Sequence, residues 1–316
     1  MKRWIPLIAA CAAMAALVLC PEAAADAARD ALRLCAEVLI PSLLPFFAVS
    51  GLLRVWGLPE LLGRLIEPVT RRLWGVGGGC ASAFLLGILG GYPLGAAAIG
   101  QLRADGAISR DEGERALAFC SNTGPAFLLG AAGMGVFHSR RIGLVLCGTH
   151  IVSAALVGTL FAPRVRTGRA SRHSDIAAAA FSDALTESVR QAADGLLSVC
   201  AFVVLFSVAA GLLEHIGYLG ALAGQLSALT GMELTAAKAL FTGLLEIGGG
   251  LGAMRGLAPT AGNTALAAFL LGFGGLAVAA QTMAVLGESD LTGRRYLPGK
   301  LLQGVLAALL TLLVNS

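Results

Sequence analysis

Charged residues are scarce in this chain: Asp, Glu, Lys and Arg make up 13% of its 316 residues, whereas hydrophobic residues make up 57%. A soluble domain usually carries about a quarter charged residues. The scarcity therefore excludes an ordinary soluble protein and indicates a polytopic membrane protein. The net charge of +4 does not indicate nucleic-acid binding, because basic residues in membrane proteins mainly set the topology.

Histidine and catalytic motifs are also scarce. Only four histidines are present, and the chain contains no GxSxG or HExxH motif, so an intramembrane hydrolase is not expected. The seven cysteines are scattered without a CxxC pair, which indicates apolar packing instead of a disulfide framework or a metal site. We expect no enzyme, no metal and no resident cofactor, while a coupling proton or sodium ion stays open.

Long apolar runs are what the chain has in abundance. After residue 25 they fall near residues 33–53, 76–101, 116–136, 142–162, 194–213, 238–258, 262–284 and 298–314. Each run is close to the roughly 20 residues that a membrane-spanning helix needs, or a little longer. Residues 1–25 resemble a signal peptide but also fit a short first membrane helix, and we favour the helix.

Glycine clusters break two of these runs near the middle, at residues 90–96 and 248–253. A break exposes backbone groups that hydrocarbon cannot satisfy, so it implies surrounding protein or a water-filled cavity. If residues 76–101 crossed the membrane, their basic flanks would lie on opposite sides, against the positive-inside rule. We therefore expect two re-entrant helical hairpins. On this topology the loop with Arg294, Arg295 and Lys300 is cytoplasmic.

The two halves of the chain share short matches in the same order, such as Leu94-Gly95-Ala96 with Leu251-Gly252-Ala253. An odd number of crossings in the first half would invert the second. The expected fold is therefore an all-α polytopic membrane protein with inverted-topology repeats. Its expected divisions are an N-terminal membrane helix or signal-like segment at 1–25, repeat one at 26–162, a basic cytoplasmic linker at 163–181 and repeat two at 182–316.

Paired helix breaks in two halves are the best sequence pointer to a transporter binding site. The candidate substrate-binding residues lie at the two breaks and at polar or glycine-rich positions of the following runs: Gly91, Tyr92, Pro93, Gly95, Ser121, Asn122, Thr123, Glu246, Gly248, Gly249, Gly250, Gly274, Gly275 and Gln281. For the glycines, close helix packing is the alternative interpretation.

Particular residues strengthen this interpretation. Pro93 suits the start of a half-helix, whose free amides attract an anion. Pro125 predicts local unwinding of residues 121–124. Glu246 is a candidate because carboxylates inside a membrane are costly. Glu37 and His150 lie nearer to the ends of their runs, where we expect water to reach them.

The strings PSLLPFF at 41–47, GYPLGA at 91–96 and LLEI at 244–247 resemble the YlbJ-like sporulation integral membrane proteins of the nucleoside-recognition (Gate) domain group. The resemblance implies a multi-pass protein of spore-forming bacteria that is associated with moving dipicolinic acid across the outer forespore membrane. It also implies a fold similar to the core of concentrative nucleoside transporters, with the candidate residues at the hairpins and unwound segments.

The expected function is therefore transport of a small organic anion, dipicolinic acid foremost, by alternating access in a bacterial cell membrane. A nucleoside or nucleobase permease and a non-transporting membrane assembly protein of spore maturation are the alternatives. The expected partners are the lipid bilayer and the anionic substrate, without nucleic acid. Contacts with other sporulation membrane proteins and a homo-oligomer stay open.

Overall fold

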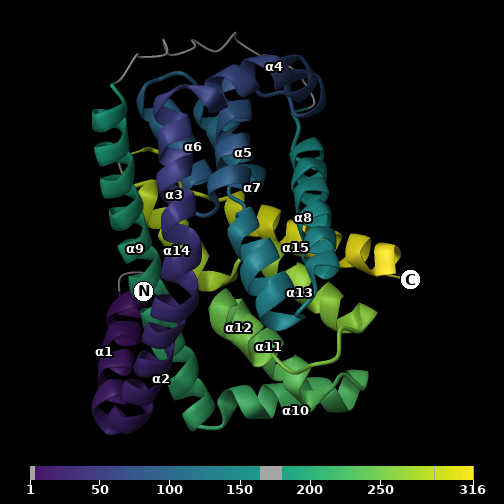
Figure 1. Ribbon diagram of the computed structural model, residues 1–316. Helices are drawn as coiled ribbons and strands as arrows, with labels where there is room; N and C mark the ends of the chain where they lie inside the picture. Colours follow the sequence, from purple (N-terminus) through teal and green to yellow (C-terminus); the bar gives the residue numbers. More distant parts are fainter. Residues whose placement is uncertain (1–3, 164–179, 288, 316) are drawn as a thin grey trace.

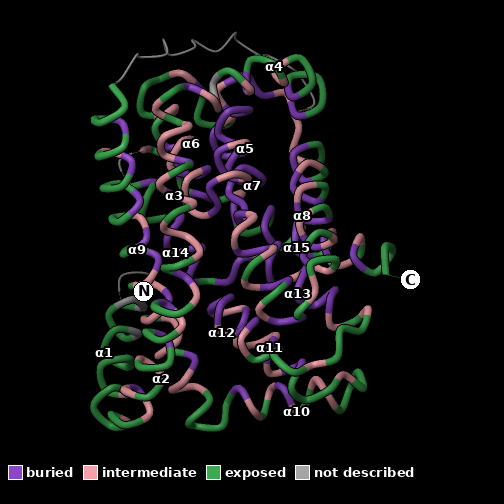
Figure 2. Tube along the Cα trace, in the orientation of Figure 1, coloured by how far each residue is buried: buried purple, intermediate pink, exposed green. Residues whose placement is uncertain are grey.

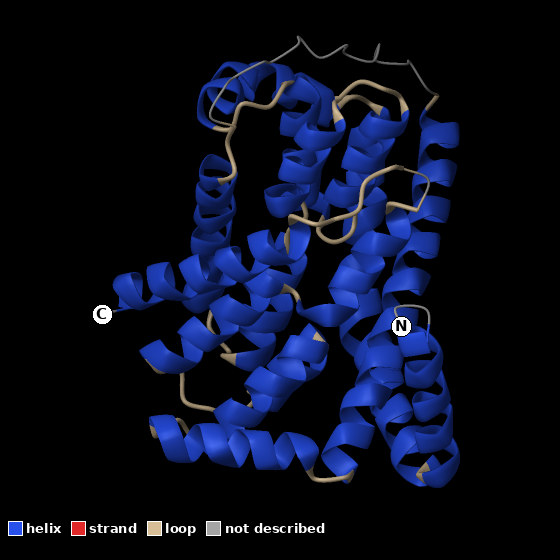
Figure 3. Cartoon of the chain, turned by 180° about the vertical axis from the view of Figure 1, so that it is seen from behind, coloured by secondary structure: helices blue, strands red, loops and turns tan. Residues whose placement is uncertain are grey.

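The computed structural model describes residues 4–163, 180–287 and 289–315, and within these ranges the chain is helical with no strand (Figure 1; Figure 3). The all-α prediction is confirmed, whereas most of the linker predicted at 163–181 lies outside the described residues. The elements are α1 (Trp4–Leu19), α2 (Pro21–Leu34), the π-helical η1 (Cys35–Leu39), α3 (Ile40–Val55), α4 (Leu58–Leu73), α5 (Gly78–Gly90), α6 (Leu94–Ala104), α7 (Arg110–Cys120), the π-helical η2 (Ala126–Val136), α8 (Arg140–Leu160), α9 (Phe181–His215), α10 (Tyr218–Thr230), α11 (Leu234–Leu245), α12 (Ile247–Ala253), α13 (Ala261–Phe273), α14 (Gly275–Val285) and α15 (Tyr296–Asn315).

In the described part of the chain, five helical stretches are long and apolar enough to cross a membrane: Pro21–Val55, Arg140–Leu160, Phe181–His215, Ala261–Val285 and Tyr296–Asn315. A sixth would be the bent pair of α4 and α5, which meet at 107°. Buried residues gather in the middle of the molecule, while large apolar side chains are exposed on its outer helices (Figure 2). This distribution fits a lipid environment and agrees with the predicted multi-pass membrane protein.

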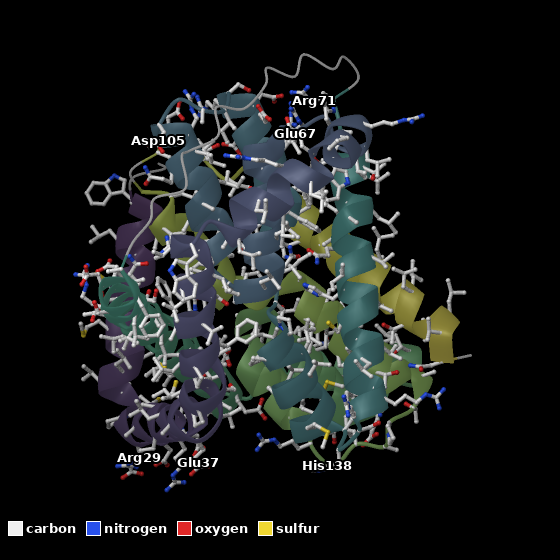
Figure 4. All side chains as sticks on the ribbon, turned by 45° about the horizontal axis from the view of Figure 1, so that its top comes forward. Arg29, Glu37, Glu67, Arg71, Asp105 and His138 are labelled. Atoms are coloured by element: carbon white, nitrogen blue, oxygen red, sulfur yellow. The ribbon has the colours of Figure 1, made fainter. Side chains whose placement is uncertain are left out.

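Two short helices lie across opposite ends of the helix bundle, α4 at one end and α10 at the other (Figure 1). Leu61, Leu65 and Val69 of α4 are each more than half exposed, as expected for an amphipathic helix at a membrane interface. Polar side chains also divide between these ends (Figure 4). Glu67, Arg71 and Asp105 lie at the α4 end, and Arg29, Glu37 and His138 lie at the opposite end.

Helices α5 and α6 form a hairpin at the first glycine break. Gly87 and Gly95 are eight residues apart, which would separate them by about 12 Å along a straight helix. Instead, a Cβ atom built on Gly95 would lie 3.0 Å from the Cα atom of Gly87, so the two helices fold back and touch. The turn contains Gly91, whose φ of 77° favours glycine, and a cis Tyr92–Pro93 peptide bond.

Helices α11 and α12 form a second hairpin. Gly243 and Gly250 would lie about 10 Å apart along a straight helix. A Cβ atom built on Gly250 would instead lie 2.3 Å from the Cα atom of Gly243. The chain therefore reverses between them, and Glu246 lies at the tip of the hairpin. Both predicted hairpins are thus present, but the second turn lies at Glu246, and the break predicted at residues 248–253 is wrong, because these residues form the helix α12.

The tip of the first hairpin touches an interrupted span. Helix α7 ends at Cys120, and residues 121–124 are not helical, which confirms the unwinding predicted from Pro125. A Cβ atom built on Gly91 would lie 3.0 Å from the backbone nitrogen of Gly124. The hairpin tip and the unwound segment are therefore in direct contact through the backbone of these two glycines.

The tip of the second hairpin touches a second interruption. Gly274, between α13 and α14, and Gly275, the first residue of α14, have φ values of 85° and 79°, which few other residues adopt. A Cβ atom built on Gly275 would lie 2.9 Å from the carbonyl oxygen of Gly243. Each hairpin tip thus rests on a break in another span.

Helix α15 packs unusually closely against its neighbours. A Cβ atom built on Gly299 would lie 2.5 Å from the Cβ atom of Ala118, and one built on Gly304 would lie 2.8 Å from the carbonyl oxygen of Phe269. These contacts enclose Lys300, whose exposed fraction is 0%. The prediction that Lys300 belongs to a cytoplasmic loop is therefore wrong, because Gly299 lets α15 pack closely against α7 and this packing buries Lys300.

Candidate functional site

An inner cavity lies where the two hairpin tips and the interrupted spans meet. Six of the predicted site residues line it: Gly91, Tyr92, Thr123, Glu246, Gly248 and Gln281. Apolar side chains of α3, α9, η2 and α14 complete its wall. Its volume is about 60 Å³, which leaves room for only a few water molecules.

A larger cavity of about 480 Å³ lies on the side of the α4 end, between α3, α5, α6 and α9. We call it the α4-side cavity. The predicted site residue Pro93 lines this cavity and not the inner one, as does Asp105 farther along α6. Phe47 lines both cavities and is 5% exposed. Its ring therefore forms part of the wall between them.

A third cavity, of about 290 Å³, lies on the opposite side of the inner cavity, between α2, α9, α10 and α11. We call it the α10-side cavity, because Leu219 of α10 contributes to its wall. Gly249 lines it, and Glu246 lines both this cavity and the inner one. The inner cavity is thus bounded by Phe47 on one side and by Glu246 on the other.

Glu246 is 1% exposed and makes its hydrogen bonds within its own hairpin. Its Oε1 accepts a hydrogen bond of 2.7 Å from the Gly248 amide, and its Oε2 accepts one of 2.5 Å from the Gly249 amide. The carboxylate therefore caps the first turn of α12 and is stabilised by amide dipoles. Among the described residues it forms no ion pair.

The remaining predicted glycines are packing surfaces. A Cβ atom built on Gly95 would lie 1.9 Å from the carbonyl oxygen of Cys120, and one built on Gly274 would lie 2.9 Å from the Tyr92 hydroxyl oxygen. Gly250 and Gly275 meet the backbone of Gly243 in the same way. These residues shape the site by allowing close backbone approach, so for them the packing interpretation describes the contacts.

The predicted residues Ser121 and Asn122 are fully buried but do not line the inner cavity. The Asn122 side chain donates to the carbonyl of Phe119 at 2.7 Å and accepts from the Gln303 side chain at 2.9 Å. Two backbone groups of this unwound segment are paired with neighbouring helices, since the Ser121 carbonyl accepts from Lys300 of α15 and the Thr123 amide donates to His150 of α8, as hydrocarbon surroundings require.

Sequence reasoning missed Lys300 and Gln303 of α15. The Lys300 ammonium donates to the Ser121 carbonyl at 2.7 Å and to the Gln303 side-chain oxygen at 2.6 Å. It also lies 5.1 Å from the centre of the Tyr92 ring, within cation–π range. A signal was present, because Lys300 falls inside the apolar run 298–314 and Gln303 follows at helical spacing.

His150 lies elsewhere than expected. It is in the middle of α8 and is 1% exposed, so the prediction that water reaches it near a span end is wrong. Its Nε2 accepts a hydrogen bond of 3.2 Å from the Thr123 amide and lies 3.3 Å from Gln303 Nε2. His150 therefore stabilises the unwound segment by accepting the hydrogen bond from the Thr123 amide. Glu37 is exposed, as expected.

Outside the spanning helices, polar contacts hold the loop before α15 against the first hairpin and α7. Arg103 of α6 pairs with Asp290 at 2.7 Å, and Asp111 pairs with Arg295 at 3.0 Å. Glu114 accepts hydrogen bonds from both the amide and the hydroxyl of Thr292. Burial raises the pKa of Glu114, but these hydrogen bonds outweigh it, so the pKa lies below its ordinary value.

Comparison with known proteins places the chain in a membrane context. The family described as Gate, nucleoside recognition, matches residues 36–163, a range that includes the first hairpin and the unwound segment. The sporulation integral membrane protein YlbJ of Bacillus subtilis (strain 168) is 31% identical to this chain over an alignment of 326 positions. The alignment covers 93% of this chain and 78% of that protein. No solved structure matches the chain.

Proposed function

Because this chain belongs to the family of the sporulation integral membrane protein YlbJ and carries a Gate nucleoside-recognition region, we propose that it transports a small organic anion by alternating access. The supporting observation is the inner cavity between two larger ones, bounded by Phe47 on one side and Glu246 on the other. A carrier needs a central site that each side reaches in turn.

The two halves of the chain serve this mechanism as inverted repeats. Each hairpin follows a short helix, α4 or α10, and these helices lie at opposite ends of the molecule (Figure 1). Each hairpin tip packs on a break in another span through glycine backbone. These parallels support an arrangement similar to the core of concentrative nucleoside transporters, with one hairpin controlling access from each end.

The substrate we propose is dipicolinic acid, a flat pyridine ring with two carboxylates, carried during sporulation across the outer forespore membrane. The aromatic side chains of Phe47, Tyr92 and Phe127 line the inner cavity, and such rings stack well on a flat heterocycle. A cavity of about 60 Å³ is too small for this molecule. Binding therefore requires the hairpins or Phe47 to move first.

Two other functions make different demands on the site. A nucleoside or nucleobase permease would need several hydrogen-bonding side chains, whereas Thr123, Glu246 and Gln281 are among the few polar side chains on the inner wall. A membrane assembly protein of spore maturation would need no internal cavity system. The cavities therefore favour transport, which we propose to need no resident cofactor and to be coupled to a proton or a sodium ion if it is driven uphill.

Ligand binding to the purified protein in lipid nanodiscs tests the substrate class. We expect dipicolinate to raise the melting temperature in a saturable way, and we expect uridine and adenine to have no effect. If uridine stabilises the protein and dipicolinate does not, the anion proposal is wrong and the permease replaces it.

A further inference from the structure

Lys300 is a buried lysine without a buried counter-ion. It is 0% exposed, and among the described residues no carboxylate lies within ion-pair distance of its ammonium group. Its hydrogen bonds go to two neutral oxygens, on Ser121 and Gln303. An unpaired charge inside a membrane protein is costly and marks a functional position by default.

The position of Lys300 relative to the inner cavity is specific. Lys300 does not line the cavity, whereas Tyr92 does. The ammonium lies over the Tyr92 ring, 5.1 Å from its centre. Tyr92 is therefore next to both the lysine and the space that a substrate would enter. A positive charge acts across such a ring, because the low-dielectric interior screens it only weakly.

The other intramembrane charge of the site is already stabilised. Glu246 faces the inner cavity, but its two carboxylate oxygens accept hydrogen bonds from the Gly248 and Gly249 amides. These neutral amides stabilise the carboxylate without cancelling its charge, so an anion in the cavity still needs a positive charge nearby. Lys300 is thus the charge in this region that an anionic ligand can complement.

We propose that Lys300 is the counter-charge for a carboxylate of the substrate, acting across the ring of Tyr92 at the tip of the first hairpin. The proposal rests on the proposed function, since it assigns the group that makes the site selective for anions. A carboxylate held in the inner cavity beside Tyr92 gains Coulomb attraction from this charge, without direct contact between the two groups. Neutral nucleosides gain nothing from this charge.

A purely structural role for Lys300 makes a different prediction. In that case its hydrogen bonds to Ser121 and Gln303 would matter and its charge would not. Lys300→Gln keeps donor hydrogens near these oxygens but removes the charge, whereas Lys300→Arg keeps the charge. Gln303→Glu acts from the other side, because it places a carboxylate beside the ammonium, which already lies 2.6 Å from the side-chain oxygen of residue 303.

Dipicolinate affinity of these variants in nanodiscs tests the proposal, with Lys238→Gln as the matched control. Lys238 is a partly exposed lysine paired with Glu214. We expect Lys300→Gln and Gln303→Glu each to weaken binding at least tenfold. Lys300→Arg should lose less than Lys300→Gln, and Lys238→Gln should bind normally.

The possible failures are distinguishable. If the wild-type protein does not bind dipicolinate, the proposed function itself fails. If the wild type binds and both Lys300→Gln and Gln303→Glu bind equally well, the counter-charge assignment is overturned while the function stands. Should Lys300→Gln not fold, Gln303→Glu is compared with Gln303→Leu, which removes the same donor to the Asn122 side-chain oxygen without adding a charge. Equal dipicolinate binding by these two variants would overturn the assignment.

Discussion

At the scale of single residues, Glu246 shows how the protein keeps a carboxylate inside the membrane. Both carboxylate oxygens accept amide hydrogens from the turn that follows, on Gly248 and Gly249. The residue thereby caps α12 and also stands between the inner cavity and the α10-side cavity. One side chain thus links the local stability of the second hairpin to the barrier on that side.

Replacing Glu246 measures how much its capping hydrogen bonds contribute to stability. A glutamine keeps one acceptor oxygen but loses the charge and the second acceptor, so we expect Glu246→Gln to lower the free energy of unfolding by about 1–3 kcal/mol. Denaturation in detergent measures the change. Glu37→Gln is the control, because Glu37 is exposed. An unchanged stability in Glu246→Gln would show that the cap contributes nothing.

At the scale of elements, glycine contacts determine the hairpins. Gly250 meets Gly243 across the second hairpin, whereas a Cβ atom built on Gly252 in the same short helix meets no atom within 4 Å. Gly250 and Gly252 are two residues apart in the same helix, yet only Gly250 has no room for a methyl group. They form a matched pair for testing whether the hairpin packing is needed.

We expect Gly250→Ala to cost about 1–3 kcal/mol, because the added methyl group forces the helices apart. It should also abolish transport, since the tip that bounds the inner cavity shifts. Gly252→Ala should leave both properties intact and raise stability slightly, as alanine does in a helix. Thermal unfolding and uptake assays on both variants check this, and equal behaviour of the pair would refute the packing account.

The contact between α7 and the loop before α15 predicts a pH dependence. Because the pKa of Glu114 is lowered in the folded protein, its contribution to stability is present above the ordinary glutamate pKa of about 4.3. It is lost as the pH falls through the lowered value. Glu114→Gln should therefore reduce stability at pH 6 and flatten its decline below pH 4. Melting temperatures between pH 3 and pH 7 test this, and parallel curves would contradict it.

At the scale of the whole molecule, the cavities and the fold belong together. The inner cavity is about 60 Å³, against about 480 and 290 Å³ for its neighbours on the α4 and α10 sides. The larger cavities lie beside the two ends of the bundle, and the hairpin tips meet between them. The centre of this conformation is therefore narrow, which agrees with the proposed carrier between its two open forms.

Phe47 is the side chain on which closure toward the α4 side depends. Phe47→Ala should join the inner cavity to the α4-side cavity and lower stability by about 3–5 kcal/mol. A cysteine introduced by Gln281→Cys should then react faster with a polar thiol reagent, as measured by mass spectrometry at that site. Phe181→Ala, at an exposed phenylalanine, is the control. Unchanged reactivity in Phe47→Ala would contradict a barrier at this residue.

Much of this arrangement is readable from the sequence, because apolar runs and glycine clusters report local geometry. The hairpins at Gly91 and Glu246 and the unwinding at residues 121–124 follow from helix breakers. The burial of Lys300 and His150 was not predicted, for the same reason in both cases. Their burial depends on close packing of α15 and α8 against other spans, and a single sequence does not reveal such long-range contacts.

The central claim is that the chain carries a small organic anion, and uptake of radiolabelled dipicolinate into proteoliposomes tests it most directly. The account predicts saturable uptake that unlabelled dipicolinate abolishes, that uridine leaves unchanged and that Gly250→Ala lacks. Wild-type protein that is correctly inserted but takes up no more dipicolinate than empty liposomes would contradict it.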